Sequence, residues 1–559
     1  MKVGISRGKV FMSGVVRSRT FRRYLAVAGV LAIFVIAFMF QAEAEEGSES
    51  TQNNQAAPKR VSVHDPSIVQ AKDGEYYIFG SHLAGAKSKD LLNWTSLGTD
   101  YDNVTNNWLY GNVRENLKGS FLWAGYDDGD CSGGKYAVWA PDVIWNPYYR
   151  NKDGSKGAYM IYYSASSTWR RSCIGYGISK NIEGPYTYVD TVIYSGFTKD
   201  GKTDGNSRRN TRWDNNYLNI KKLTDSGVLK NGISNQWFKG NEWNHNYGPN
   251  AIDPTLFFDK TGNKLYMVYG SWSGGIYLCE LDRETGAVKY PGTDSVDGVS
   301  GNYVDRYFGV HLAGGNHQSG EGPYIIYDQE SGYYYLYETY GGLTANGGYN
   351  MRLFRSKEVT GPYLDASGKN AAGNNSNNEQ YGIKLMGNYK LRNSSIGYKA
   401  AGHNSAIIDG GKNRYLIYHQ RFDNGTENHE VRVHQQFLNQ KGWPVTAVFE
   451  NKNDPINHYD SKEVLGKYDL YDHGQKTTSD MVKKETITLL ENGKIQGDKT
   501  GTWKQTKGNK YDYITMNING TEYQGVFFKQ HDENGTAEPT MTFSTVGDNN
   551  TCIWGIKSE

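Results

Sequence analysis

Five short segments of the 559-residue sequence place a residue that can give or take a proton directly before a hydrophobic run. Carboxyl groups gathered at one place can share the tasks of acid–base hydrolysis, in which one acid protonates a leaving oxygen and one carboxylate activates water. The segments are HDPSIV from His64, APDVIW from Ala140, IDPTLFF from Ile252, GEGPYII from Gly320 and GHNSAII from Gly402. Their leading polar residues are Asp65, Asp142, Asp253, Glu321 and His403.

Three of these residues, Asp65, Asp253 and Glu321, fit the roles that hydrolysis of a glycosidic bond requires. One carboxyl stays protonated, a second is ionised, and a third can raise the pKa of the proton donor, since crowded carboxyl groups oppose each other's ionisation. Sugar rings also present apolar C–H surfaces to aromatic side chains. Four aromatic residues near the segments are candidate platforms, with packing in the core as the equal alternative: Trp139, Trp145, Trp272 and Tyr324.

The same five segments define a structural repeat. Each is followed by a turn rich in Gly, Asp, Asn or Lys and then by a Tyr-rich strand, and a third strand follows in most copies. Turns such as 72–74 (KDG) and 260–263 (KTGN) would reverse the chain within small antiparallel meanders. The second strands read EYYIFGS, AYMIYYS, KLYMVYGS, YYYLYET and RYLIYHQ.

The spacing of the repeats, roughly 70 to 110 residues without long helical periodicity between them, predicts the blades of a β-propeller. We therefore expect an all-β fold with a five-bladed β-propeller over residues 61–458. The first strand of a blade lines the central channel, so the five leading residues should face one cavity. A single acid before a strand is more often a solvated turn residue, but five in phase favour a site.

The sequence changes character from about Tyr468. Short strands alternate apolar and polar residues around Asn-Gly and Lys-Gly-Asn turns, and no leading acid occurs. This predicts a separate C-terminal all-β, barrel-like domain over residues 459–559. Long polar insertions at 191–250 and 365–388 are expected to be loops that either decorate the surface or set binding specificity.

Residues 1–44 have the pattern of a secretory signal peptide. Seven basic residues precede the apolar run 24–40, which ends at Ala42-Glu43-Ala44. We expect a secreted, extracellular protein without stable membrane insertion of the mature chain, and an uncleaved N-terminal anchor is the alternative. Residues 45–60 are polar and low in complexity, which predicts a flexible linker.

Charge and cysteine content narrow the possible partners. Residues 1–44 carry seven basic residues and one acid, so the formal net charge falls from +2 for the whole chain to −4 for the remainder, which argues against nucleic-acid binding. Four cysteines in an exported chain of this length do not form a disulfide framework. Cys131 and Cys173 are a candidate pair, with buried thiols as the alternative. We expect a monomer.

In this order along the chain, the motifs resemble those of glycoside hydrolase family 43. This resemblance implies a five-bladed propeller that hydrolyses glycosidic bonds with inversion of configuration. It makes Asp65 the general base, Asp253 the modulator of the acid and Glu321 the general acid, and it leaves Asp142 a structural or substrate-positioning group. The matching motifs are His64-Asp65-Pro66-Ser67, Trp139-Ala140-Pro141-Asp142, Ala251-Ile252-Asp253-Pro254-Thr255, Ser319-Gly320-Glu321-Gly322-Pro323-Tyr324 and Gly402-His403-Asn404-Ser405.

Within the family, the chain resembles the extracellular endo-α-1,5-L-arabinanases that carry a C-terminal β-barrel. The similar segments are YGIKLMGNY at 381–389, GSWSGG at 270–275 and GWPV at 442–445. The resemblance implies plant arabinan or arabino-oligosaccharides as substrate, and one metal ion, usually calcium, held in the channel by His403 and waters. A lone histidine is by itself a poor calcium ligand. The residues expected to contact substrate are Trp139, Asp142, Asn250, Ser271 and Trp272.

Two alternatives remain open. An exo-acting α-L-arabinofuranosidase or β-xylosidase would use the same scaffold, since the loops around the channel decide whether a polymer can lie across it. A non-catalytic carbohydrate-binding propeller would lack one of the three acids, yet Asp65, Asp253 and Glu321 are all present. The sequence contains no GxSxG nucleophile elbow and no HExxH or CxxC metal motif.

Overall fold

The structure is a computed structural model of the chain. It describes residues 58–98, 103–125, 136–168, 171–201, 210–373, 376–533 and 538–558, without the side chains of 167 and 168. The expected signal peptide, nearly all of the expected linker and Cys131 lie outside the described residues. Within the described part, no helix is long and apolar enough to cross a membrane.

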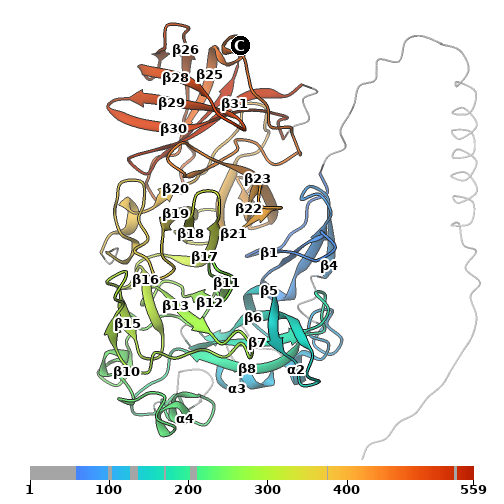
Figure 1. The fold of residues 1–559 in the computed structure, drawn as a ribbon, viewed down its shortest axis with the longest axis vertical. Coiled ribbons are helices and arrows are strands. Elements are labelled where there is room, and N and C mark those ends of the chain that lie inside the picture. Colours follow the sequence, from blue (N-terminus) through green and yellow to red (C-terminus); the bar gives the residue numbers. More distant parts are fainter. Residues whose placement is uncertain are drawn as a thin grey trace, which may run out of the picture. The chain divides into compact units, whose positions relative to one another are not determined.

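Five antiparallel sheets of four to six strands form the blades of a propeller in the described chain, which confirms the expected all-β, five-bladed fold (Figure 1). The innermost strands β1, β5, β11, β17 and β21 each contact the next, and β21 contacts β1. Blade 1 contains β1 (Ser67–Gln70), β2 (Tyr76–Phe79), β3 (Gly85–Ser88) and β4 (Trp94–Gly98), and blade 2 contains β5 (Val138–Arg150), β6 (Lys156–Thr168), β7 (Arg171–Ser179) and β8 (Thr187–Tyr194).

Blade 3 adds a small hairpin to its outer edge. It contains β11 (Thr255–Phe258), β12 (Leu265–Tyr269), β13 (Ile276–Leu281), β16 (Gly309–Ala313), β15 (Tyr303–Asp305) and β14 (Ser295–Val296) in spatial order. Blade 4 contains β17 (Glu321–Asp328), β18 (Tyr333–Tyr340), β19 (Asn350–Ser356) and β20 (Ile383–Lys384). Blade 5 contains β21 (Tyr398–Asp409), β22 (Asn413–Phe422), β23 (His429–Leu438) and β24 (Pro444–Thr446).

The expected turns close the first hairpins of the blades. In blade 1, Ala71 N donates to Glu75 O at 2.8 Å, and Gly74 has a φ of 91°. In blade 3, Gly262 has a φ of 69° in the turn between β11 and β12. Glycine adopts this left-handed conformation without a steric penalty, which is why these turns reverse the chain tightly.

Hydrophobic packing between neighbouring blades holds the ring together. All residues of β2 and β12 are buried, because each blade packs against a neighbour on both faces. The cluster between the first and last blades contains Ile68 and Ile78 of blade 1 and Ile417 and Val431 of blade 5. Burial of each such side chain contributes about 1.5–3 kcal/mol, so packing closes the ring between the two ends of the propeller.

Short helices occupy the connections. In the insertion between blades 2 and 3, Trp237 is fully buried and its indole Nε1 donates to Asp305 Oδ2 at 2.8 Å, so part of this insertion belongs to the core rather than to the surface. The short elements are η1 (Ser81–Leu83), α2 (Val113–Asn116), α3 (Lys118–Ala124), α4 (Ile220–Asp225), η3 (Asn235–Trp237), β9 (Phe238–Lys239), β10 (Glu242–Trp243), η4 (Ala371–Gly373), η5 (Asn378–Gln380) and α5 (Ser461–Val464).

The C-terminal strands form a closed eight-stranded barrel, in which β25 pairs with β32. The sequence-based boundary at residue 458 lies between the last propeller strand, which ends at Thr446, and the first barrel strand, which begins at Gly466. The barrel strands are β25 (Gly466–Asp472), β26 (Lys484–Leu489), β27 (Lys494–Gly497), β28 (Gly501–Lys507), β29 (Asp512–Ile518), β30 (Thr521–Gln530), β31 (Thr540–Gly547) and β32 (Cys552–Lys557).

Polar contacts join the barrel domain to blade 4. Arg352 of β19 is fully buried and donates to the carbonyl of Gln475 and, at 3.3 Å, to Thr477 Oγ1. Lys384 of β20 donates to Lys476 O at 2.7 Å. Both cations therefore satisfy backbone and hydroxyl oxygens of the segment between β25 and β26.

Candidate active site

A residue with a left-handed backbone conformation lies within or just before each innermost strand. The φ angles are 54° at Asp65, 36° at Ala140, 57° at Asp253, 56° at Gly322 and 48° at His403. Holding a non-glycine residue there costs about 1–3 kcal/mol, and such positions cluster at functional sites. Proline follows all of these residues except His403. The conformation therefore marks one equivalent position in all five blades.

Strand pairing is irregular at these positions. The pairing of β5, β17 and β21 with their neighbours shifts register between Trp139 and Asp142, between Glu321 and Tyr324, and between Gly402 and Ser405. A bulge bends its strand and changes the direction of the side chains beside it. In blades 1 and 3 the carboxyl group comes from the left-handed residue, and in blade 4 it comes from the residue before.

Residues two positions after the left-handed residue join neighbouring blades. Ser67 Oγ donates to Asp142 Oδ1, and Asp142 Oδ2 accepts from Leu256 N at 2.6 Å, so Asp142 ties the innermost strands of blades 1, 2 and 3. The residue at the same position in blades 3, 4 and 5 also contacts the next blade. Thr255 Oγ1 donates to Pro323 O, the Tyr324 hydroxyl forms a hydrogen bond with the backbone of Ala406, and Ser405 Oγ donates to Pro66 O.

Asp142 therefore does not share the position of Asp65. The sequence interpretation set the two in phase, but the left-handed residue of blade 2 is Ala140. Asp142 is 2% exposed, and burial, opposed by hydrogen bonds from Ser67 and Leu256, raises its pKa to about 7. With so little exposed surface it fits the structural role that the resemblance allowed, and it does not fit the expected contact with substrate.

Asp65 is held at both carboxylate oxygens. Ser81 of η1 donates to Oδ2, and the same hydroxyl accepts from Ala140 N at 2.8 Å. His64 Nδ1 lies 2.8 Å and His403 Nδ1 lies 3.1 Å from Oδ1. Burial alone would raise the pKa of Asp65, but His403 and His64 outweigh burial and hold the pKa well below its usual value. Asp65 is therefore an ionised carboxylate.

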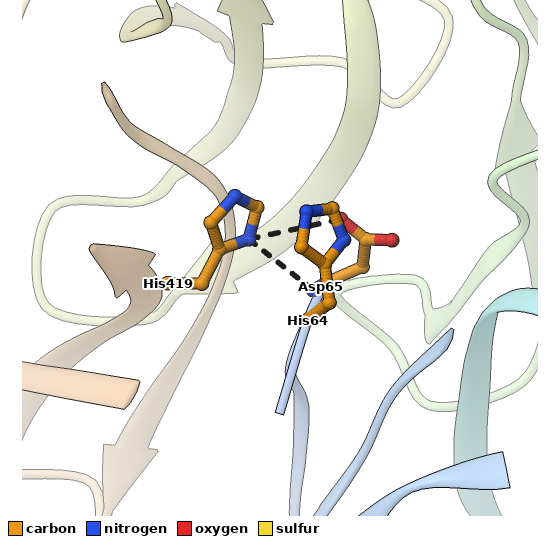
Figure 2. A group of neighbouring side chains, drawn as sticks. All are labelled: His64, Asp65 and His419. Atoms are coloured by element: carbon orange, nitrogen blue, oxygen red, sulfur yellow. Dashed lines mark hydrogen bonds and ion pairs between the residues drawn. The ribbon is translucent and has the colours of Figure 1, made fainter. Parts of the chain in front are cut away.

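His419 of β22 lies beside Asp65 (Figure 2). Its Nδ1 accepts a hydrogen bond from Asp65 N at 3.2 Å and lies 3.7 Å from Oδ1. Burial is the main cause that lowers the pKa of His419 well below its usual value, so the ring is neutral. These three residues bring metal-ligand atoms within 4.8 Å of one another, but Nδ1 of each ring already has a partner inside the cluster.

Three uncharged donors hold Glu321. Tyr349 OH donates to Oε1 at 2.6 Å, and Trp272 Nε1 and Ser271 Oγ donate to Oε2 at 2.9 and 3.1 Å. Trp272 has a φ of 47°, and its backbone N–H donates to Gly320 O at 2.7 Å. Two of the residues expected to contact substrate, Ser271 and Trp272, therefore orient the carboxyl group of Glu321.

Asp253 lies close to both of the other carboxyl groups. Its backbone N–H donates to Ser164 Oγ at 2.9 Å, and its Oδ2 accepts from Gly322 N at 3.2 Å. Burial raises its pKa well above the usual value, and the negative charges of Glu321 and Asp65 raise it further. The structure thus brings together the three acids expected from the sequence, with the pKa of Asp65 lowered and that of Asp253 raised.

Trp139 and Asn250 are the remaining residues that were expected to contact substrate. Trp139 is half-buried at the start of β5 and pairs with Ser164, the residue that accepts a hydrogen bond from Asp253 N. Trp139 therefore stays a candidate sugar platform. Asn250 is buried, and its Oδ1 accepts from Ser195 Oγ at 3.4 Å.

The two other candidate platforms pack as core residues. Trp145 lies against Tyr159, with ring centroids 4.9 Å apart, and Lys72 Nζ lies 3.5 Å from the centre of its ring. Tyr324 packs in the hydrophobic cluster of blades 4 and 5. Both side chains therefore follow the alternative that the sequence left open.

His403 is the candidate residue for the metal that the family resemblance implies. Its neighbour Asn404 is 2% exposed, and neither atom of the Asn404 amide has a hydrogen-bond partner among the described residues. A buried amide with an open donor and acceptor fits the waters around a hydrated cation. The chemistry of His403 and Asn404 is therefore compatible with a hydrated divalent ion.

Several residues that hold the carboxyl groups were not found from the sequence. Ser81 lies in a short 3₁₀ helix, Tyr349 directly precedes β19, and His419 lies in a second strand, so none belongs to a leading motif. The segment His419-Gln420-Arg421 did contain a signal. Alternate residues of a strand point to the same face, so a strand here would place His419 and Arg421 side by side.

Comparison with known proteins identifies the enzyme family to which this fold and site belong. Residues 226–444 match the glycosyl hydrolases family 43, and residues 448–555 match the C-terminal lipocalin-like domain of that family. An extracellular endo-alpha-(1->5)-L-arabinanase 2 of Bacillus subtilis is 37% identical over 514 residues, which cover 89% of this chain and 93% of that protein. The chain belongs to glycosyl hydrolase family 43.

Solved structures agree with this assignment along nearly the whole chain. The family 43 YxiA protein of Bacillus licheniformis is 37% identical with a TM-score of 0.72, over 90% of this chain and 99% of that chain. The endo-1,5-alpha-L-arabinanase of Thermotoga petrophila is 33% identical with a TM-score of 0.72, over 90% of this chain and 100% of that chain. The protein is a glycoside hydrolase with a five-bladed propeller and a C-terminal barrel.

Proposed function

We propose that this hydrolase cleaves internal α-1,5-L-arabinofuranosidic bonds of plant arabinan outside the cell, with inversion of configuration. The observation that carries the chemistry is the convergence of three carboxyl groups: His403 and His64 lower the pKa of Asp65 despite its burial, burial raises the pKa of Asp253, and three uncharged donors hold Glu321. The substrate is supported by two similar proteins named as endo-arabinanases. Export from the cell is supported by the leader pattern of residues 1–44 and by the similar Bacillus subtilis protein, which is named as an extracellular enzyme.

In the proposed single displacement, Asp65 is the general base and Glu321 the general acid. Asp65 takes a proton from water as the water oxygen bonds to the anomeric carbon, and Glu321 gives its proton to the leaving oxygen as the glycosidic bond breaks. Because the charge of Glu321 is one cause of the raised pKa of Asp253, these two groups compete for one proton. We therefore assign Asp253 as the modulator of the acid.

The same proposal includes one calcium ion, which His403 would hold through its ring and Asn404 through bound waters. When bound, the ion supplies positive charge close to the carboxyl groups. Asp65, Asp253 and Glu321 carry out the proton transfers described above, and the ionised state of Asp65 is already supported by His64 and Ser81.

The experiment that tests this proposal is chromatography of the products from linear and branched arabinan over an early time course. Internal cleavage is expected to release mixed arabino-oligosaccharides first, with the inverted β anomer visible by proton NMR before mutarotation. The Glu321→Gln variant is the control, because it keeps the side-chain size and removes the acidic proton.

Other product patterns would overturn the proposal in defined ways. Arabinose or a single short product from the earliest times would identify an exo-acting enzyme on the same scaffold. Xylose from xylan oligosaccharides would move the substrate to β-xylosides. The absence of products from every pentosan, together with retained polysaccharide binding, would identify a carbohydrate-binding propeller.

A further inference from the structure

A buried arginine lies behind the histidine that contacts Asp65. Arg421, in β22, is 4% exposed, and its Nη2 lies 3.0 Å from His64 Nε2. Its Nε donates to Leu343 O at 2.7 Å, and its Nη1 donates to Glu427 O. The guanidinium group is therefore fixed by two backbone carbonyls, and the third direction points at His64.

This contact determines which nitrogen of His64 carries the proton. A guanidinium group has only donors, so His64 Nε2 must accept and cannot itself be protonated. The proton of the neutral ring is then on Nδ1, which lies 2.8 Å from Asp65 Oδ1. A hydrogen bond from Nδ1–H to the carboxylate is the arrangement that suits both groups.

Neighbouring rings hold His64 in this orientation. His64 stacks on His419 with ring centroids 4.0 Å apart and an angle of 24° between the planes. His429 meets His64 edge-on at 5.0 Å, and its Nε2 lies 3.2 Å from Ser62 Oγ. Rotation of the His64 ring would break the contacts with Arg421 and Asp65 together.

We propose that Arg421 and His64 are positioning residues for the general base: Arg421 fixes the tautomer of His64, and His64 directs one oxygen of Asp65. This inference rests on the proposed role of Asp65. Ser81 fixes the other oxygen, so the plane of the carboxylate is set from two sides. Base catalysis depends on such geometry, since a proton is taken efficiently only by an oxygen held in line with the attacking water.

Enzyme kinetics of three variants test the proposal. Arg421→Met removes the donor and is expected to lower kcat on linear arabinan by about 10- to 100-fold, as loss of an outer orienting partner does elsewhere, with KM changed less than about twofold. His64→Asn keeps an N–H in the place of Nδ1–H and has no tautomer to fix. We therefore expect His64→Asn to stay more active than Arg421→Met, and the double variant to match His64→Asn alone.

A spectroscopic measurement on the wild-type protein provides a test that no folding defect can obscure. In a sample labelled with ¹⁵N-histidine, the resonances lost in His64→Asn belong to His64 and should show a protonated Nδ1 and an unprotonated Nε2. Protonation of Nε2 would overturn the proposal, and so would an unchanged kcat in Arg421→Met.

The failure of this inference can be told from failure of the proposed function. An inactive Asp65→Asn variant beside a fully active Arg421→Met variant would overturn the inference and leave Asp65 as the base. An Asp65→Asn variant with wild-type activity would overturn the proposed function itself.

Discussion

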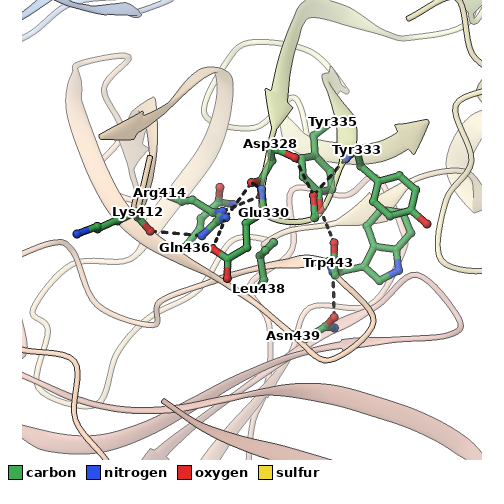
Figure 3. A network of polar contacts seen from close by, with 12 residues as sticks. Asp328, Glu330, Tyr333, Tyr335, Lys412, Arg414, Gln436, Leu438, Asn439 and Trp443 are labelled. Atoms are coloured by element: carbon green, nitrogen blue, oxygen red, sulfur yellow. Dashed lines mark hydrogen bonds and ion pairs between the residues drawn. The ribbon is translucent and has the colours of Figure 1, made fainter. Parts of the chain in front are cut away.

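Strand β17 begins with one carboxylate, Glu321, and ends with another, Asp328, and the two are surrounded in opposite ways. At the end of the strand, Arg414 places Nε 2.8 Å from Asp328 Oδ2 and Nη2 2.9 Å from Oδ1, and the same Nη2 lies 2.9 Å from Glu330 (Figure 3). Lys510 of the barrel lies 2.8 Å from Glu330 as well. Burial lowers the pKa of Arg414, but the hydrogen bonds and charges of Asp328 and Glu330 outweigh burial and raise it.

At the start of the strand, three uncharged donors hold Glu321, and burial followed by the negative charges of Glu321 and Asp65 raises the pKa of Asp253. A buried charge with a complete set of partners is a structural feature, whereas like charges kept together reduce stability and poise groups for proton transfer. The difference shows that one strand supports the fold at one end and the chemistry at the other. Variants at the two ends should therefore separate activity from stability.

The largest effect is expected at the catalytic end. Glu321→Gln should lower kcat on arabinan by about 10³-fold, because the leaving oxygen is no longer protonated as the bond breaks. An aryl arabinofuranoside with a good leaving group needs less protonation and should keep a larger share of its rate. Steady-state kinetics on the two substrates give the comparison, and Asp65→Asn, which removes the base, should lose both rates alike. Equal losses of both rates in Glu321→Gln would contradict the assignment of the acid.

The sequence was sufficient to predict the propeller, because every blade repeats the same leading motif and a Tyr-rich second strand. The same motifs predicted Asp65, Asp253 and Glu321, which the structure brings together, and their catalytic roles stay a prediction. The prediction that Asp142 is equivalent to Asp65 was wrong by two residues, because Ala140 takes that position in blade 2. A strand bulge changes which residue faces inward and leaves no clear mark in a hydrophobic pattern.

The partners of the three acids could not be predicted in the same way. Tyr349, directly before β19, reaches Glu321 across blade 4. Arg421 of β22 in blade 5 reaches His64 beside blade 1 because the ring closes between these two blades. Such contacts depend on blade packing over long sequence separations. No local propensity or spacing encodes them.

A large loss of stability without loss of activity is expected at the other end of β17. Arg414→Met leaves Asp328 buried without its cation, which should lower the free energy of unfolding by about 3–5 kcal/mol. Below its unfolding temperature the variant should keep the wild-type kcat. Urea denaturation and kinetics on the same preparation measure both quantities. The double variant Arg414→Met with Asp328→Asn should recover part of the loss, and a lower kcat at unchanged stability would contradict the comparison.

An effect that depends on pH, and is smaller for each pH unit than the loss at Arg414, is expected at Glu338 of β18. This side chain is 1% exposed, its Oε1 has no hydrogen-bond partner among the described residues, and burial raises its pKa to about 8. Between pH 4.5, the pKa in the unfolded chain, and about 8, the folded state keeps a proton that the unfolded chain has lost. The contribution of this group to folding is therefore complete below pH 4.5 and is lost as the pH rises toward 8. Its contribution should fall by about 1.4 kcal/mol for each pH unit in this interval.

Glu338→Gln against the wild type should isolate this contribution. Urea denaturation at several pH values between about 5 and 8 should show the variant gaining stability relative to the wild type as the pH rises. Glu330 provides the opposite case: burial alone would raise its pKa, but Lys510 and Arg414 lower it, so its contribution is lost as the pH falls. Glu330→Gln should therefore lose stability relative to the wild type above its unfolded pKa. Two parallel pH profiles for wild type and Glu338→Gln would show that Glu338 is not held protonated by burial.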